Sequence, residues 1–391
     1  MALSGDWLAV GVPFWHCSGG PPGAVLMYRL GTDHQYRHVQ TLCNVGPGTS
    51  ITIDGDSMVV GWSHYDATPG DDLYTGRVSF LRWNPVLQHW AIAGIRDGSA
   101  TGLLGSSVAM RNGVVIAGES GYAQGHGRIR SWRWAGAFVI EETPVLPPQV
   151  PFPIRPGNEP EGFGSQVDLD LRGCVGDCIE PLDALVTLGR SGVYTAARTS
   201  AGWGPLALKK PLRGMKTAFS DIAINDSLVV TTMQMFGDDP DSPCATDIWR
   251  TEVRLLQRLP GSENLREIGI LCRDQMPFGP GPQFVNEVEL DDRGPVFHFS
   301  LPDEPALMEG VVSTWAMDVR GRPELVDALV DPDLVTVRWE ETGFFAYNPD
   351  FAGDYFGDGL AIDGDRMAIG APMRNALLST LGSGYVVIYR R

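Results

Sequence analysis

The sequence predicts an all-β fold built from one repeated unit of four short strands. Each copy reads as an apolar strand, a tight Gly/Asp turn, a second strand ending in glycine, a variable loop and a third strand with aromatic ends. Tight hairpin turns need positive φ, which Asn-Gly, Asp-Gly and Gly-Asp pairs tolerate. The turn and second strand are clearest at 5–11, 55–61, 112–118, 225–230 and 364–370, and two weaker copies occupy 182–189 and 293–299.

A unit of this kind cannot bury both of its faces alone, so it must stack on similar units, and radial stacking gives a β-propeller. We therefore expect a seven-bladed β-propeller of four-stranded antiparallel blades, formed by residues 1–391 as a single domain. The expected blades are 1–45, 46–98, 99–148, 149–213, 214–275, 276–350 and 351–391.

The first and last blades look incomplete. The residues before Gly5 form only a stub of a first strand, and the last copy ends after its third strand at Arg391. One upstream segment would supply both missing strands, which suggests part of a longer exported protein. In the sixth blade we interpret 335–347 as the outer strand, preceded by an extra region at 320–333.

Charge and motifs narrow the function. The formal net charge of -17 argues against a nucleic acid or an anionic membrane as partner, unless a local basic stripe exists. No stretch is long and apolar enough to span a bilayer, so we predict no direct membrane insertion. We also expect a monomeric domain. The sequence lacks Gly-x-Ser-x-Gly, His-Glu-x-x-His and Cys-x-x-Cys motifs and a phosphate-binding glycine loop with lysine, so no enzyme is predicted.

The unit resembles the FG-GAP repeat of integrin α-subunit head propellers and of many bacterial exported proteins. Phe356-Gly357 and Gly370-Ala371-Pro372 match both halves of that name, and partial matches lie at 11–13, 104–109 and 163–167. The resemblance covers nearly the whole chain and implies a seven-bladed propeller. It says little about the ligand, because one fold hosts many sites.

The six cysteines form pairs by position. Cys17 and Cys43 occupy the same two places in the first repeat as Cys244 and Cys272 in the fifth, and Cys174 and Cys178 share one turn. We expect the disulfides Cys17–Cys43, Cys174–Cys178 and Cys244–Cys272, which indicate an extracellular, cell-surface or periplasmic location. Six buried free thiols are the alternative.

One turn suggests a cofactor. In family members that bind calcium, the ion sits between the first and second strands of a blade, held by alternating carboxylates. In the fourth repeat Asp168, Asp170, Asp177 and Asp183 fit that pattern. Arg172 stands where a third acidic ligand is usual, so a decayed site is the alternative.

The loops between second and third strands share one face of a propeller. In the first three blades they carry Trp15, His16, Trp62, His64, Tyr65, Tyr122 and His126. Such side chains can form a recognition rim, because aromatic rings give contact area with a polar handle. The alternatives are that they pack the loops against one another, or that three histidines bind zinc.

These observations predict an exported, non-catalytic propeller that binds a protein or glycan through its loop face, as an adhesion or recognition module. Two alternatives stay open. One is a carbohydrate-active enzyme whose central channel is lined by carboxylates from Asp221, Glu287, Glu289 and Asp358. The other is a structural module of a larger surface protein.

Overall fold

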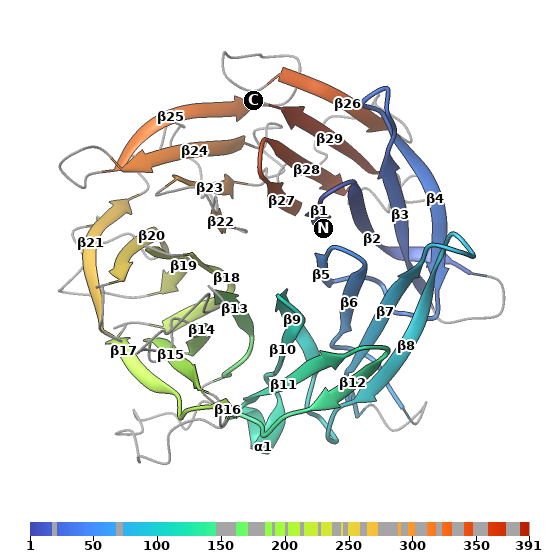
Figure 1. Cartoon of the computed structure of the whole chain (residues 1–391). Helices are drawn as coiled ribbons and strands as arrows, with labels where there is room; N and C mark the ends of the chain where they lie inside the picture. The colour runs from blue at the N-terminus through green and yellow to red at the C-terminus, as the bar shows by residue number, and fades with distance from the viewer. Residues whose placement is uncertain are drawn as a thin grey trace. The chain divides into compact units, whose positions relative to one another are not determined.

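The computed structural model describes nineteen stretches of the chain. They are residues 1–17, 22–67, 73–145, 162–170, 184–189, 192–199, 202–211, 215–225, 228–236, 244, 249–258, 264–272, 288–290, 296–301, 311–317, 323–330, 340–346, 359–372 and 384–390. In these stretches the strands form seven antiparallel sheets, six of four strands and one of five (Figure 1). The one helix among them is the short α1 (Tyr122–Gly125).

The first four sheets follow the chain in order. They consist of β1 (Ala2–Ser4), β2 (Trp7–His16), β3 (Pro22–Leu30) and β4 (Tyr36–Cys43); β5 (Ser50–Asp54), β6 (Ser57–Trp62), β7 (Arg77–Asn84) and β8 (His89–Asp97); β9 (Leu104–Arg111), β10 (Val114–Glu119), β11 (Arg128–Ala135) and β12 (Phe138–Glu141); and β13 (Gln166–Asp170), β14 (Ala184–Gly189), β15 (Gly192–Thr199), β16 (Gly202–Trp203) and β17 (Ala207–Pro211).

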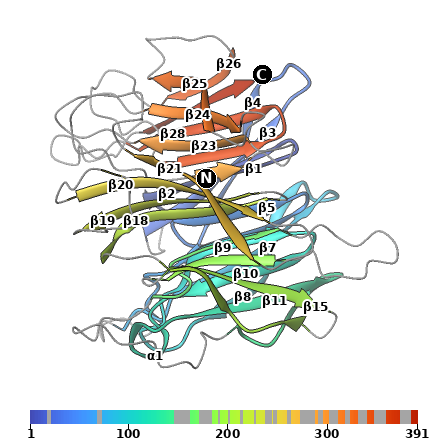
Figure 2. The same cartoon turned by 90° about the vertical axis from the view of Figure 1, so that its left-hand side faces the viewer.

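The other three sheets lie in the C-terminal half. They consist of β18 (Met215–Ile224), β19 (Leu228–Phe236), β20 (Trp249–Arg258) and β21 (Leu265–Cys272); β22 (Val288–Leu290), β23 (Val296–Leu301), β24 (Val311–Met317) and β25 (Pro323–Val330); and β26 (Glu340–Ala346), β27 (Gly359–Asp363), β28 (Arg366–Pro372) and β29 (Gly384–Arg390). Strands β23, β24 and β25 are seen side by side in Figure 2.

The chain divides into two compact units. Unit 1 contains Met1–Asp6, Leu30–Tyr36 and Arg213–Arg391, and unit 2 contains Trp7–Arg29 and Arg37–Leu212. Within unit 2 successive sheets pack through their first strands, β5 against β9 and β9 against β13. Within unit 1, β22 packs in the same way against both β18 and β27. Repeated four-stranded sheets stacked on their neighbours are the building plan of a β-propeller, as the sequence predicts.

The core lies between neighbouring sheets. All six residues of β10 are buried, because a sheet covers each face of this middle strand. Towards the second sheet, Val115 and Ala117 join a cluster with Phe80, and towards the fourth sheet Ile116 joins one with Phe163. A strand with neighbours on both faces therefore reads as a continuous apolar run.

Glycine pairs set the closeness of these sheets in unit 2. A Cβ atom added to Gly61, at the end of the second strand, would lie 3.1 Å from the Gly105 Cα atom and still closer to its carbonyl group. Gly118 meets Gly164 in the same way, and Gly11 meets Gly48. The backbones approach so closely that no side chain fits, which explains the glycine towards the end of the second strand in the first three sheets.

The outer strand of the sixth sheet differs from our expectation. β25, in the region interpreted as extra, pairs with β24 from Met317↔Pro323 to Val311↔Val330 and completes that sheet. β26, which overlaps the expected strand at 335–347, instead pairs with β29. The expected assignment is therefore wrong, as is the prediction that the last sheet lacks a fourth strand, because residues preceding β27 provide it. β1 is as short as predicted.

Two of the three expected disulfides are present. Cys17 is bonded to Cys43 and Cys244 to Cys272, with Cα atoms 6.0 and 5.2 Å apart. Cys174 and Cys178 lie outside the described residues. Two disulfides are compatible with an extracellular or periplasmic protein. Nowhere in the described ranges is a helix long and apolar enough to cross a membrane.

A buried tyrosine in unit 1 gives a prediction for alkaline pH. Burial raises the pKa of Tyr36 to about 12 from 10.0, although its hydroxyl accepts a hydrogen bond from Arg366 at 3.0 Å. The folded protein therefore keeps this proton where the unfolded chain has lost it. The stability from this group is complete below pH 10.0 and is lost as pH rises towards about 12.

Tyr36→Phe should accordingly flatten the alkaline loss of the free energy of unfolding. Urea titrations at a series of pH values above neutrality measure it. An unchanged alkaline slope in the variant would show that other groups control this loss.

Candidate functional site: the loop face of the second and third sheets

The predicted rim residues lie where the second strands end. Trp62 closes β6, and its ring meets Tyr65 edge-on with centroids 4.8 Å apart. The centroids of the His64 and Tyr74 rings are 5.4 Å apart. Tyr74 is not among the predicted rim residues. Tyr122 begins α1 and His126 follows it. Trp15 and His16 end β2, and their side chains lie outside the described part.

Two of these tyrosines are covered by arginines. The Arg77 guanidinium carbon lies 3.6 Å from the Tyr65 ring centroid, and Arg128 lies 3.8 Å from that of Tyr122. Each arginine opens the third strand of the same sheet. Cation–π stacking at this distance fixes the ring in place. Tyr65 and Tyr122 therefore hold their loops together, as in the packing alternative.

Each of these arginines also binds a carboxylate. Arg77 donates to both oxygens of Asp97, at 2.6 and 3.0 Å. Arg128 donates from Nε to Glu119 Oε2 at 2.5 Å. The same stack of tyrosine, arginine and carboxylate thus occurs in the second and third sheets, although the carboxylate comes from a different strand in each.

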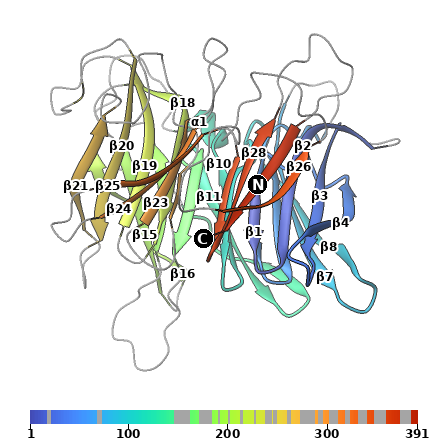
Figure 3. The same cartoon turned by 90° about the horizontal axis from the view of Figure 1, so that it is seen from above.

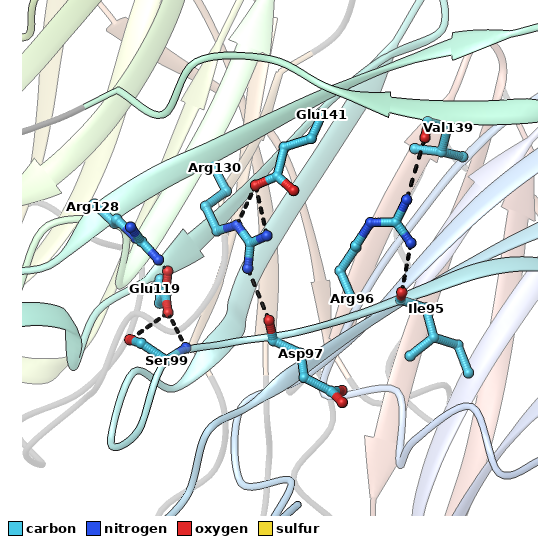
Figure 4. A network of polar contacts seen from close by, with 9 residues as sticks. All are labelled: Ile95, Arg96, Asp97, Ser99, Glu119, Arg128, Arg130, Val139 and Glu141. Atoms are coloured by element: carbon cyan, nitrogen blue, oxygen red, sulfur yellow. Dashed lines mark hydrogen bonds and ion pairs between the residues drawn. The ribbon is translucent and has the colours of Figure 1, made fainter.

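The carboxylate of Glu119 is the centre of a wider network (Figure 4). Its side chain is fully buried, and Oε1 accepts hydrogen bonds from the Ser99 backbone N–H at 2.6 Å and from the Ser99 hydroxyl at 2.7 Å. Arg130 donates to the Asp97 carbonyl at 2.9 Å and to the Glu141 carboxylate. The network therefore joins the second sheet, the connection at 98–103 and the third sheet.

Backbone hydrogen bonds link the same loops from sheet to sheet. Leu104 donates to the Thr75 carbonyl at 3.0 Å, and Gly121 donates to the Gly102 carbonyl at 2.9 Å. Phe163, entering the fourth sheet, donates to the His126 carbonyl at 3.1 Å. A surface held in this way loses little conformational entropy on binding a partner.

Several loop residues are nevertheless strained. Thr101, Leu103, Ala123 and Gln124 all have φ between 50° and 63°, the left-handed region that non-glycine residues avoid. Each such residue costs on the order of 1 to 3 kcal/mol, and clusters of them are typical of ligand sites. Nothing in the sequence marks these positions, because glycine is the residue that signals positive φ.

The exposed groups on this frame are few. His64 and His126 are exposed, and Leu73 and Tyr74 are 40% and 41% exposed. These side chains can contact a ligand directly, whereas Tyr65 and Tyr122 support them. In the described stretches no group of three or more His, Cys, Asp or Glu side chains is arranged to hold a metal ion.

Two of the four predicted calcium ligands lie in the described residues, and each has a partner within the protein. Asp170 ends β13 with 2% exposure, and its Oδ1 lies 3.3 Å from the Arg111 guanidinium. Asp168 Oδ1 accepts a hydrogen bond from the Leu169 N–H at 2.8 Å. An arginine of the neighbouring sheet therefore neutralises Asp170. Asp177, Asp183 and Arg172 lie outside the described residues.

Two of the four residues proposed to line a central channel, Asp221 and Glu289, lie in the described stretches. Asp221 accepts a hydrogen bond from the Val288 N–H at 3.0 Å, which ties β18 to β22 within unit 1. Glu289 is half-buried on β22. Glu287 and Asp358 lie outside the described residues. Asp221 thus has a structural contact between two sheets.

The comparisons concern the fold. No family model and no curated protein matches the chain. The crystal structure of a Lactobacillus plantarum protein aligns with a TM-score of 0.55 at 12% identity, covering 97% of this chain and 95% of that one. The fold is a β-propeller. A structure from Bacteroides uniformis, provisionally described as a 6-phosphogluconolactonase, aligns at 9% identity with a TM-score of 0.39, covering 84% of this chain and 100% of that one.

Proposed function

We propose that this propeller is a non-catalytic, exported recognition module that binds a protein or glycan through its loop face. The observation that supports it most is the network around Glu119, which holds exposed aromatic and imidazole groups on a cross-linked frame. Large rigid side chains on preorganised loops are what a specific binding surface needs. The disulfides support export.

We also propose membership of the FG-GAP type with a ring of seven blades. The paired glycines support the first part, because both glycines of the motif's name are required where sheets touch, as at Gly118 and Gly164. The second part treats each described sheet as one blade. Class averages from electron microscopy, viewed along the ring axis, test the count. Six blades, with one sheet outside the ring, would overturn it.

Binding is tested on the exposed rim. His64→Ala and His126→Ala, at exposed side chains, should leave the free energy of unfolding within about 0.5 kcal/mol of the parent while reducing capture of ligand. A glycan array and a pull-down from the native cell surface measure capture and separate a lectin from a protein receptor. His38→Ala, an exposed histidine on β4, is the matched control. Unchanged capture by both rim variants would refute the loop-face site.

A further inference from the structure

The two disulfides occupy equivalent places in their sheets. In the first sheet Cys17 directly follows β2, and its partner Cys43 ends β4. In the fifth sheet Cys244 lies in the connection from β19 to β20, and its partner Cys272 ends β21. Each bond therefore ties a loop between the second and third strands to the end of the fourth strand. Figure 3 shows β2, β3 and β4 of the first sheet side by side in blue.

The two bonds differ in their access to solvent. Cys17 and Cys43 are half-buried. Cys244 and Cys272 are buried, with exposed fractions of 7% and 5%. A disulfide is reduced when a thiolate reaches one of its sulfur atoms, and exposed disulfides are the labile ones. A reductant can therefore attack the bond of the first sheet in the folded protein, whereas the bond of the fifth sheet first requires local opening.

The loop of the first sheet also has less support from the strand ladder. Pairing of β2 with β3 is regular as far as Val12↔Ala24, then shifts register, and ends at His16↔Pro22. Proline cannot donate a backbone hydrogen bond, so this end of the ladder is weaker than its base. β19, in contrast, pairs with β20 without a shift along all of its 9 residues. The disulfide therefore has a larger share in holding the loop in the first sheet than in the fifth.

We propose that the Cys17–Cys43 disulfide is a redox-sensitive clamp, which an external dithiol opens in the folded protein to release the loop between β2 and β3. One thiolate of the dithiol attacks a sulfur atom of the bond, a mixed disulfide forms, and the other cysteine leaves as a thiolate. The second thiol of the dithiol then displaces the first cysteine. Two electrons and two protons pass to the protein, which then holds two thiols, and the dithiol becomes a disulfide.

The clamp controls what the first sheet contributes to the loop face. Trp15 and His16, two of the predicted rim residues, directly precede Cys17 in the sequence. Release of their backbone increases the conformational entropy that is lost on binding, so ligand capture should weaken. This effect on capture rests on the proposed function, whereas the opening of the clamp does not.

Timed reduction with dithiothreitol tests the order in which the two bonds open. Samples are quenched with iodoacetamide at intervals, and peptide mass spectrometry measures the alkylation of each cysteine. Cys17 and Cys43 should be alkylated at least about tenfold faster than the buried pair of the fifth sheet, because the buried pair reacts only from an opened state. Equal rates, or faster reduction of the buried pair, would overturn the proposal.

Hydrogen exchange of the selectively reduced protein measures the release of the loop. Amides at 13–24 should exchange about tenfold faster than in the oxidised protein, while those at 7–12 and 25–29, in the regular part of the ladder, keep their rates. Reoxidation with glutathione disulfide should restore slow exchange. Unchanged exchange at 13–24 would show that the bond does not hold the loop, and faster exchange throughout the chain would show that it holds the whole fold. Either result refutes a local clamp.

Two double variants repeat the test without a reductant. Cys17→Ser/Cys43→Ser should show the fast exchange at 13–24, and Cys244→Ser/Cys272→Ser, the matched control, should keep it slow. Fast exchange at 13–24 in the control alone would contradict the assignment to the first bond. Ligand capture by the same samples separates the two proposals, because fast exchange with unchanged capture would confirm the clamp and exclude the first sheet from the binding surface.

Discussion

Gly118→Ala is expected to lower the free energy of unfolding by about 3 kcal/mol or more, the upper end of the cost of overpacking. An added Cβ would stand 2.8 Å from the Gly164 Cα atom and closer still to its carbonyl group. The obstacle is backbone of the neighbouring sheet, so no rotamer change can relieve it. Urea unfolding followed by tryptophan fluorescence measures the effect.

Gly136→Ala is the matched control for this substitution. Gly136 has φ of 62°, and an added Cβ there would meet nothing within 4 Å. Its cost should be limited to about 1 to 2 kcal/mol, the penalty for a left-handed alanine. Equal losses at the two positions would mean that backbone conformation, and not contact between sheets, explains the glycine at the end of the second strand of the third sheet.

The sequence predicts the fold best where the turn chemistry is explicit. The Gly55-Asp56 and Asn112-Gly113 pairs mark hairpins that the structure contains, with φ of 57° at Gly55 and 73° at Gly113. The connection between β24 and β25 contains Gly321 but none of these paired turn residues. The turn signal for the fourth strand of the sixth sheet is therefore weaker, and pairing with β24 shows that this strand is β25 and not β26.

The candidate site was predictable only in part. Loop position and residue type suggested Trp62 and His64, which do lie on the loop face. The role of Tyr65 was not predictable, because it depends on Arg77, twelve residues away, and that arginine depends in turn on Asp97. Contacts between residues distant in sequence arise from the packing of strands and leave no local pattern.

Glu119→Ala is expected to destabilise the protein by about 3 to 5 kcal/mol, as removal of one partner from a buried ion pair does. The substitution leaves the Arg128 guanidinium, 18% exposed, without this carboxylate, and removes the acceptor shared by the Ser99 N–H and hydroxyl. Because Ser99 lies in the connection at 98–103, ligand capture by the loop face should also fall under conditions where the variant is still folded.

Glu141→Ala separates this effect from the general loss of a salt bridge. Glu141 pairs with Arg130 at 2.6 Å, but its side chain is 35% exposed, so water can solvate the arginine that remains. Its loss should cost within about 1 kcal/mol. Urea unfolding at neutral pH compares the two variants, and capture assays on the folded fractions follow. If both variants lose the same stability, burial of the Glu119 carboxylate does not hold the loop face together.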